Sequence, residues 1–283
     1  MLHVVQRLAL SLLACLVIAL PIQAQEVNRN IRFGMPKQNA KAVNDPKIED
    51  HVITREQYVL SFNGKLNTPN WVSWQLVPAD IGNTARGAFE PDPDLHKGFH
   101  KITSHAYNAC GFDRGHMCPS KDRSDTKANN DAVFYMTNII PQAPNNNQKP
   151  WEQLEAYCRD LAKHGDELYI VCGPHGTGGE GKNGMALSVG KGKSHVNVPA
   201  STWKVIMVLP KGAVPDRRTR MIAVVVPNRQ DVEENWTKHR VSVRHVEELT
   251  GLTFFPNLPQ AVAEAIKEPV DRVSVTIKKR KFP

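Results

Sequence analysis

The sequence predicts an α+β fold in a single domain, and three features of the 283-residue chain support this prediction. Predicted strands and helices do not alternate regularly, which argues against a doubly wound parallel sheet. A hydrophobic content of 41% suffices at this length for one substantial core, or at most for two smaller ones. No heptad pattern or short repeat occurs, which excludes a coiled coil and a solenoid.

Residues 1–24 have the composition of a cleaved export signal. Arg7 precedes an uncharged apolar run at residues 8–20, and a small residue follows at Ala24. The run is shorter than the roughly 20 apolar residues that cross a bilayer, so an export signal is favoured over a membrane anchor. A lipid-modified Cys15 is the less favoured alternative, because the apolar stretch continues past it. We therefore expect a secreted or periplasmic protein with no membrane partner.

The segment after the signal contains two strands and a long connection. Residues 25–54 are polar without a period, so we expect a loose N-terminal arm. Residues 58–62 and 71–77 predict two strands of a hairpin-like pair, with a turn at Asn63-Gly64. Residues 78–110 are rich in Pro, Gly, Asp and His and predict a long irregular connection. Long ordered loops in compact domains are uncommon and are often functional.

The clearest helix of the chain begins at Pro150 and ends before Gly165, where a C-terminal cap belongs. Before it, residues 133–140 predict a strand that Pro141 ends, and residues 141–149 predict an Asn-rich turn. The apolar face of the helix is formed at helical spacing by Trp151, Leu154, Tyr157, Cys158 and Leu161.

The remainder of the chain is mostly β, with late helices. A helix is predicted at residues 243–250 with Ser242 as its N-cap and Gly251 at its end, and a short helix after Pro259. The predicted strands are residues 168–172, 196–198, 203–209 and 221–226.

These elements place one domain at residues 55–267 and a basic tail at residues 268–283, which carries Lys278-Lys279-Arg280-Lys281. The whole chain has 36 Lys and Arg against 28 Asp and Glu, a net charge of +8. A surplus of this size suits an anionic partner, although an ordinary basic surface explains it equally well.

A glycine-rich stretch at residues 173–184 imitates phosphate-binding motifs. Its glycines fit the spacing of a dinucleotide fingerprint, and Gly181-Lys182 nearly completes a P-loop. Both motifs need a helix directly afterwards whose N-terminal amides hold the phosphate. Asn183-Gly184 follows instead, so we predict a flexible glycine loop.

The mature chain has an even number of cysteines: Cys110, Cys118, Cys158 and Cys172. In an oxidising compartment they permit two disulfides, in any of three pairings that the sequence leaves open. Their spacing matches no closed zinc site.

His116 is the main catalytic candidate in the stretch of residues 110–155. Imidazole, with an ordinary pKa near 6.5, is mostly neutral at pH 7 and serves as a base. Arg114 lies two positions earlier, so on a strand it shares a face with His116, and its planar fork matches phosphate. Gly115 between them allows close approach of the backbone to a ligand. These residue types suit phosphodiester hydrolysis, which needs a base for water and cations for the developing charge.

Asn147 is the candidate metal ligand, because no carboxylate cluster is present and Mg²⁺ keeps most of its waters. Glu155 lies eight residues further, roughly 12 Å along a helix axis, where it is placed to bind metal-held water. Asn138, near a strand end, is placed to hold the imidazole in its productive tautomer. Singly, such residues are more often surface, capping or turn residues. Together they favour a catalytic site.

These motifs together resemble the DNA/RNA non-specific endonuclease family, which includes secreted bacterial nucleases and mitochondrial endonuclease G. The central match is Asp113-Arg114-Gly115-His116-Met117, followed by residues 137–142, Asn147-Gln148 and residues 151–155. Further similar segments lie at residues 71–72, 82–86, 171–174, 198–199, 203–206 and 249–252. The likeness covers roughly residues 55–260, while the glycine-rich insert at residues 173–184 and the basic tail match no segment that we can place in the family.

The resemblance implies a ββα-metal (His-Me finger) fold with a central, mostly antiparallel sheet flanked by helices. It also implies Mg²⁺-dependent cleavage of DNA and RNA by water, leaving 5′-phosphate ends, with Mn²⁺ or another divalent cation as the alternative. Phosphates rather than base edges are bound, so cleavage is indifferent to sequence. A homodimer is left open. The resemblance implies that His116 is the general base and that Asn147 is the direct ligand of the metal. It implies that Glu155 orients metal-bound water and that Asn138 positions His116. Arg86 and Arg114 are implied to bind the phosphate.

Two other functions are compatible with the same residues. A catalytically silent nucleic-acid-binding protein would show salt-sensitive binding without a metal-dependent product, although intact His116, Asn147 and Glu155 argue against it. A hydrolase of another phosphodiester, such as a cyclic or nucleotide-sugar substrate, would have a deep enclosed pocket instead of an open basic groove.

Overall fold

The computed structural model describes residues 28–39 and 46–275. The predicted export signal at residues 1–24 and the lysines and arginine of the tail at residues 278–281 lie outside the described part of the chain. Within that part, none of the helices combines the length and the apolar character that crossing a membrane requires.

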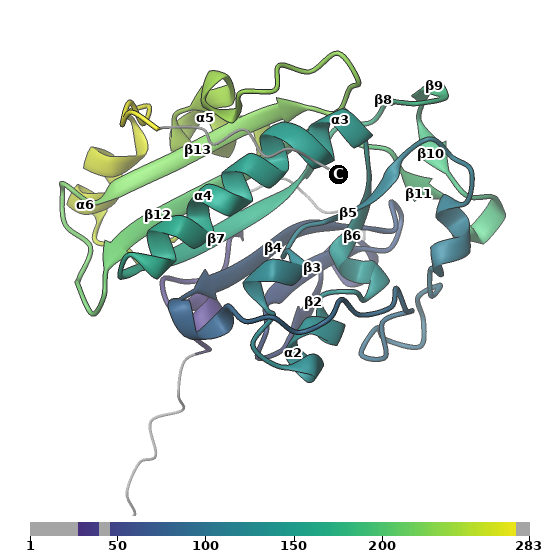
Figure 1. Cartoon of the computed structure of the whole chain (residues 1–283), viewed down its shortest axis with the longest axis horizontal. Helices are drawn as coiled ribbons and strands as arrows, with labels where there is room; N and C mark the ends of the chain where they lie inside the picture. The colour runs from purple at the N-terminus through teal and green to yellow at the C-terminus, as the bar shows by residue number, and fades with distance from the viewer. Residues whose placement is uncertain (1–27, 40–45, 276–283) are drawn as a thin grey trace, which may run out of the picture.

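A seven-stranded antiparallel sheet lies at the centre of the described structure (Figure 1). It confirms the strands predicted at residues 58–62, 71–77, 168–172, 203–209 and 221–226. In spatial order the strands are β14 (Arg240–Val241), β13 (Arg220–Pro227), β12 (Ser201–Pro210), β7 (Asp166–His175), β4 (Thr68–Leu76), β3 (Val59–Asn63) and β2 (His51–Thr54).

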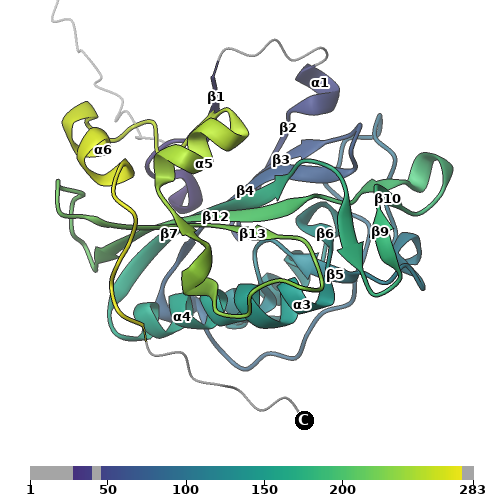
Figure 2. The ribbon, with the colours of Figure 1, turned by 90° about the horizontal axis from the view of Figure 1, so that it is seen from above.

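Helices cover both faces of the sheet, which explains why its central strands are buried on both sides (Figure 2). On one face α4 (Glu152–Lys163) packs against a core that includes Ile170 and Ile206. On the other face lie α5 (Val243–Thr250) and α6 (Gln260–Lys267). Burial of each large apolar side chain contributes about 1.5–3 kcal/mol, so the domain is stabilised by a core on each side of one sheet.

The helix α5 has the bounds that the sequence predicts. The side chain of Ser242 accepts a hydrogen bond from the backbone N–H of His245 at 3.1 Å, which caps the N-terminus. Gly251 ends the helix with φ at 70°, in the left-handed region that favours glycine. The short helix expected after Pro259 is α6.

The described parts of the N-terminal arm at residues 25–54 are packed against the domain, which corrects the expectation of a loose segment. Asn30, in the short helix η1 (Arg29–Ile31), is 3% exposed. Its side chain accepts a hydrogen bond from the Gln75 N–H at 3.1 Å and donates one to the Glu56 carbonyl at 2.8 Å. These contacts are polar, and the apolar side chains that also pack here, such as Phe33 against Tyr169, are too few to give a hydrophobic period in the sequence.

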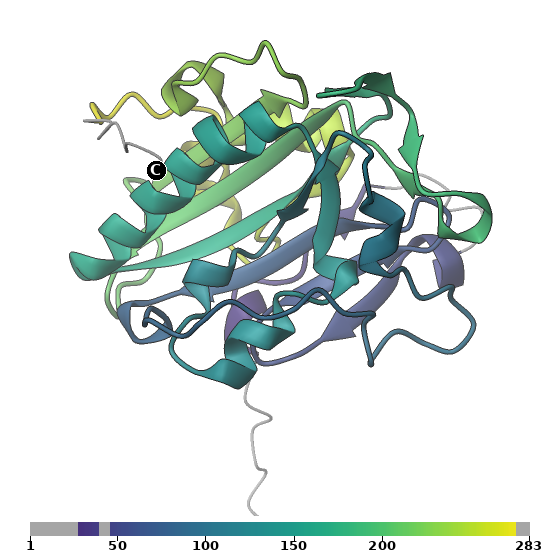
Figure 3. The same ribbon diagram turned by 45° about the vertical axis from the view of Figure 1, so that its right-hand side comes forward.

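A two-stranded hairpin, β5 (Asp113–His116) with β6 (Ile139–Gln142), packs beside the start of α4 (Figure 3). The prediction of a strand at residues 133–140 is therefore wrong in its bounds, because the strand begins at Ile139 and continues through Pro141. Residues 141–149 are largely helical rather than a turn. The elements around the hairpin are α2 (Lys127–Ala132), η5 (Met136–Asn138), α3 (Pro144–Asn146) and the π-helix η6 (Asn147–Trp151).

The glycine-rich stretch forms a second hairpin, β8 (Gly179–Gly181) with β9 (Gly184–Ala186), instead of the expected flexible loop. The N–H of Lys182 in its turn donates to the carbonyl of Gly111 at 2.8 Å, which docks the turn just before β5. No helix follows directly, in agreement with the rejection of a phosphate-binding motif. The remaining elements are α1 (Pro46–Glu49), η2 (Pro78–Asp80), η3 (Ser104–Tyr107), η4 (Ser120–Asp122), η7 (Gly192–Ser194), η8 (Trp236–His239), and the strand pairs β1 (Lys37–Gln38) with β15 (Leu252–Thr253) and β10 (Ser188–Val189) with β11 (Val196–Asn197).

Candidate active site

His116 is the last residue of β5, and its imidazole is buried between two aromatic rings. The ring of Phe134 lies edge-on at a centroid distance of 4.6 Å, and that of Phe89 is tilted at 5.3 Å. Burial, together with the positive charge of Arg86, lowers the pKa of His116 to about 3. The imidazole is therefore uncharged at neutral pH. Its Nε2 atom is buried and has no hydrogen-bond partner among the described residues.

Arg86 and Arg114 lie on the same two rings that enclose His116. The guanidinium of Arg86 is 5.1 Å from the centre of the Phe134 ring, and that of Arg114 is 5.1 Å from the centre of the Phe89 ring. The structure thus brings together three of the residues predicted from the sequence. Sequence reasoning missed the two phenylalanines, which come from separate segments without a motif and lie near His116 only in the folded chain.

Gly115 has a different role from the one expected. A Cβ atom at this position would lie 2.1 Å from Oε1 and 2.6 Å from Cβ of Gln142, on the neighbouring strand. The side chain of Gln142 is fully buried and donates to Oδ1 of Asn146 at 2.7 Å. The glycine therefore makes room for Gln142 inside the hairpin, and the expectation that it admits a ligand is corrected.

Replacing Gly115 with alanine is expected to destabilise the protein by about 1–3 kcal/mol, because the new methyl group overpacks the hairpin against Gln142. Thermal unfolding of the G115A variant measures this loss. Gly98 offers a matched control, since the nearest atom to its added Cβ would be 3.4 Å away, an ordinary contact. Normal stability of G115A combined with weaker nucleic-acid binding would instead support the ligand-approach role.

Asn138 is fully buried, and its side chain binds backbone rather than the imidazole. Its Oδ1 accepts from the N–H of Cys118 at 2.9 Å, and its Nδ2 donates to the carbonyls of Cys118 and Val133 at 2.9 and 2.8 Å. Its own carbonyl accepts from the N–H of Met117 at 2.9 Å. The amide therefore fixes the chain that directly follows His116, without a bond to the ring.

Asn147 begins the π-helix η6 and is tied to the first residue of β5. Its Nδ2 donates to Oδ2 of Asp113 at 2.8 Å, and Nε2 of Gln148 donates to the same oxygen at 2.8 Å. The bond to Asp113 uses the amide nitrogen of Asn147, and the amide oxygen has no hydrogen bond to the described residues. A free, oriented amide oxygen fits a hard cation that keeps most of its waters.

Glu155 lies one turn into α4 and points toward the sheet. Its side chain is 12% exposed, and Oε1 lies 3.7 Å from the ammonium of Lys204 in β12. Burial raises the pKa of Glu155 to about 7, and the charge of Lys204 offsets part of this rise. Glu155 and Asn147 do not bond to each other directly, but both belong to one continuous helical segment at residues 144–163.

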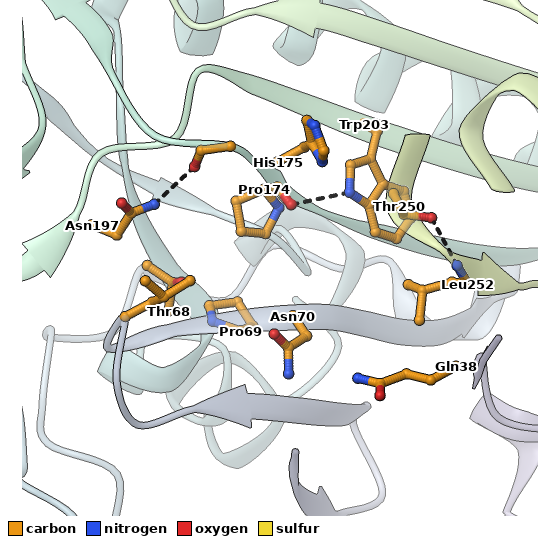
Figure 4. A pocket seen from close by; sticks show the side chains of 12 residues that line it. Gln38, Thr68, Pro69, Asn70, Pro174, His175, Asn197, Trp203, Thr250 and Leu252 are labelled. Atoms are coloured by element: carbon orange, nitrogen blue, oxygen red, sulfur yellow. Dashed lines mark hydrogen bonds between the residues drawn. The ribbon is translucent and has the colours of Figure 1, made fainter. Parts of the chain in front are cut away.

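The described residues contain no cluster of metal-binding side chains, and a pocket that they line lies away from the predicted site. No three His, Cys, Asp or Glu side chains in the described ranges are grouped so as to hold a metal ion. In this structure Cys110, Cys118, Cys158 and Cys172 are free thiols. A pocket lined by Asn70, His175 and Trp203 among others contains no predicted site residue and lies on the α5 side of the sheet (Figure 4).

A two-stranded hairpin that carries a histidine, followed by a helix that begins with a candidate metal-binding asparagine, defines the ββα-metal nuclease fold. The family model for DNA/RNA non-specific endonuclease matches residues 35–261, so the chain belongs to this family of nucleic-acid-cleaving enzymes. Members of the family depend on a divalent metal ion.

Several relatives share most of their length with the chain. A nuclease from Nostoc sp. strain PCC 7120 is 38% identical, over 92% of this chain and 96% of the relative. Human mitochondrial endonuclease G is 32% identical, over 72% of this chain and 69% of the relative. A chain in the crystal structure of the EndoG/EndoGI complex superposes with a TM-score of 0.68 at 25% identity, covering 84% of this chain and 94% of that chain.

Proposed function

We propose that this protein is an exported, Mg²⁺-dependent endonuclease that hydrolyses DNA and RNA with His116 as its general base. The observation that carries the proposal is the buried, uncharged imidazole between two aromatic rings, each of which bears an arginine. A base beside two cations suits attack on a phosphodiester, because the base activates water while the cations bear the charge of the phosphate.

In the proposed reaction, neutral His116 removes a proton from a water molecule, which attacks the phosphorus in line with the leaving 3′-oxygen. Arg86 and Arg114 bind the phosphate and stabilise its developing charge. The amide oxygen of Asn147 would hold the divalent cation, which supplies charge stabilisation at the leaving oxygen. Asn138 fixes the backbone after His116, and Glu155 would orient the waters that a cation at Asn147 keeps. The products carry 5′-phosphate ends.

The nature of the nucleophile sets the range of substrates. Because water attacks, the 2′-hydroxyl of RNA is not needed, and both DNA and RNA are cleaved. Binding through phosphates makes cleavage indifferent to base sequence and weaker as salt rises. Export rests on the composition of residues 1–24 and suits a location outside the cytoplasm.

Removal of divalent metal is expected to abolish cleavage. Purified protein that begins at residue 25 is incubated with plasmid DNA and with RNA, in Mg²⁺ and then with a chelator, and the products are separated on a gel. Both substrates should be degraded in Mg²⁺, spared by the chelator and degraded again when Mg²⁺ or Mn²⁺ is restored. Chelator-insensitive degradation would contradict the metal requirement. Salt-sensitive binding without any product would indicate the catalytically silent alternative.

A further inference from the structure

Lys204 is a buried lysine on a largely apolar face of the sheet. It lies within β12, where it pairs with Cys172 of β7 and Val224 of β13, and its side chain is 1% exposed. The neighbouring side chains on this face, such as Ile206, belong to the core beneath α4. The alternation of β12 would accommodate an apolar residue at position 204.

The surroundings of the Lys204 ammonium provide one close anion. The ammonium lies 4.2 Å from the centre of the Trp151 ring and 5.5 Å from that of Trp74. It forms no hydrogen bond with the described residues, and the carboxylate of Glu155 at 3.7 Å is its ion-pair partner. The charge of Lys204 therefore interacts with the carboxylate of Glu155 and with two aromatic rings.

Removing an ammonium from water carries a desolvation penalty that an apolar side chain avoids, so a buried ion pair is weak evidence for a role in stability. Here the partner is a residue of the proposed active site. Resting on the proposed function, we infer that Lys204 is a positioning residue that favours the ionised form of the Glu155 carboxylate and holds it in place to orient the waters of the cation. Lys204 touches neither the substrate nor the metal and acts through Glu155.

The charge state of Glu155 depends on a small group of neighbours. Burial raises the pKa of Glu155 to about 7, so its carboxylate is only partly ionised at neutral pH even with Lys204 present. Burial by itself lowers the pKa of Lys204, but the negative charge of Glu155 and those of the neighbouring acidic groups together raise it by more, so the ammonium stays charged. The other titratable and charged groups that face this pair are Glu152, Cys158 and Arg159 of α4, Asp122 of η4 and Cys172 of β7.

The test measures the Glu155 carboxyl directly, in protein without metal or substrate. Carboxyl ¹³C resonances are followed by NMR as a function of pH in the wild type, K204M and K204R, with E155Q to assign the signal. An opposite charge at this distance shifts a carboxyl pKa by roughly 1–3 units, so K204M should raise the midpoint by that amount and K204R should largely restore it. The acid limb of the pH–rate profile should move by the same amount, with activity recovered at alkaline pH.

A buried lysine on the other face of the sheet provides the control. Lys267 is 2% exposed and pairs with Glu247 at 2.7 Å, so K267M should lower thermal stability without moving the Glu155 midpoint. An unchanged midpoint in K204M would overturn the inference, and K204Q carries the same test if K204M does not fold. Absence of cleavage by the wild-type protein would instead overturn the proposed function, because the carboxyl titration is read without metal.

Discussion

Replacing His116 with alanine should lower the rate of DNA and RNA cleavage by about 10²–10⁴-fold while leaving nucleic-acid binding nearly unchanged. The imidazole is the proposed base, and the two arginines proposed to bind phosphate lie on Phe134 and Phe89 rather than on the imidazole itself. Single-turnover cleavage in Mg²⁺ measures the loss, and binding of an uncleaved duplex in chelator measures retention.

His245 offers a matched control for this substitution, because it is exposed on α5, across the sheet from the site. H245A should cleave as fast as the wild type, and near-normal cleavage by H116A would refute the assignment of the base. Burial lowers the pKa of His116 to about 3, so the imidazole stays uncharged in mild acid. The loss of activity as pH falls should therefore follow Glu155, whose carboxyl gains a proton below its pKa of about 7.

Replacing Asn147 with alanine should weaken Mg²⁺ binding and lower cleavage by more than the roughly 10–100-fold that loss of an outer-shell partner costs. The proposal gives this side chain the single direct protein contact to the cation, so no other residue compensates. Isothermal titration of the variant with Mg²⁺ and with Mn²⁺ measures the affinity, and cleavage assays over a range of metal concentration measure the activity.

Asn145 lies two residues earlier and tests whether any lost amide in this segment has the same effect. Its Nδ2 donates to the carbonyl of Gln230 at 2.6 Å, a contact that serves the packing of α3. N145A should lose some stability and keep its metal affinity. Unchanged metal affinity in N147A would show that the cation is held elsewhere.

The sequence predicts the fold wherever apolar residues form a short continuous run or repeat at helical spacing. The central strands are such runs, because both faces of the sheet are covered, whereas α5 has helical spacing and a cap at each end, so its bounds are correct to the residue. The arm at residues 25–54 has no such run or period, because it is anchored by polar side chains such as Asn30 and by a few apolar ones such as Phe33. The strand predicted at 133–140 fails for a different reason: apolar residues in short helical turns leave the same short run as a strand.

The residues of the candidate site could be predicted where local spacing carries the information, but not where distant partners do. The two-residue spacing of Arg114 and His116 predicts that they share a face, and both contact Phe89 in the structure. Phe89 and Lys204 could not be found from the chain alone, since their importance depends on partners far away in the sequence. Gly115 shows the converse, because a local motif suggested a ligand where a distant side chain fills the space.

The hydrogen bond from Asn147 to Asp113 places both ends of β5 in the proposed chemistry. One terminal residue of this four-residue strand anchors the candidate cation ligand, and the other is the candidate base. The extended backbone between them spans about 10 Å. β5 thus works as a molecular ruler: an insertion or deletion within it would misplace both groups at once, whereas length changes in the preceding connection would leave their separation intact.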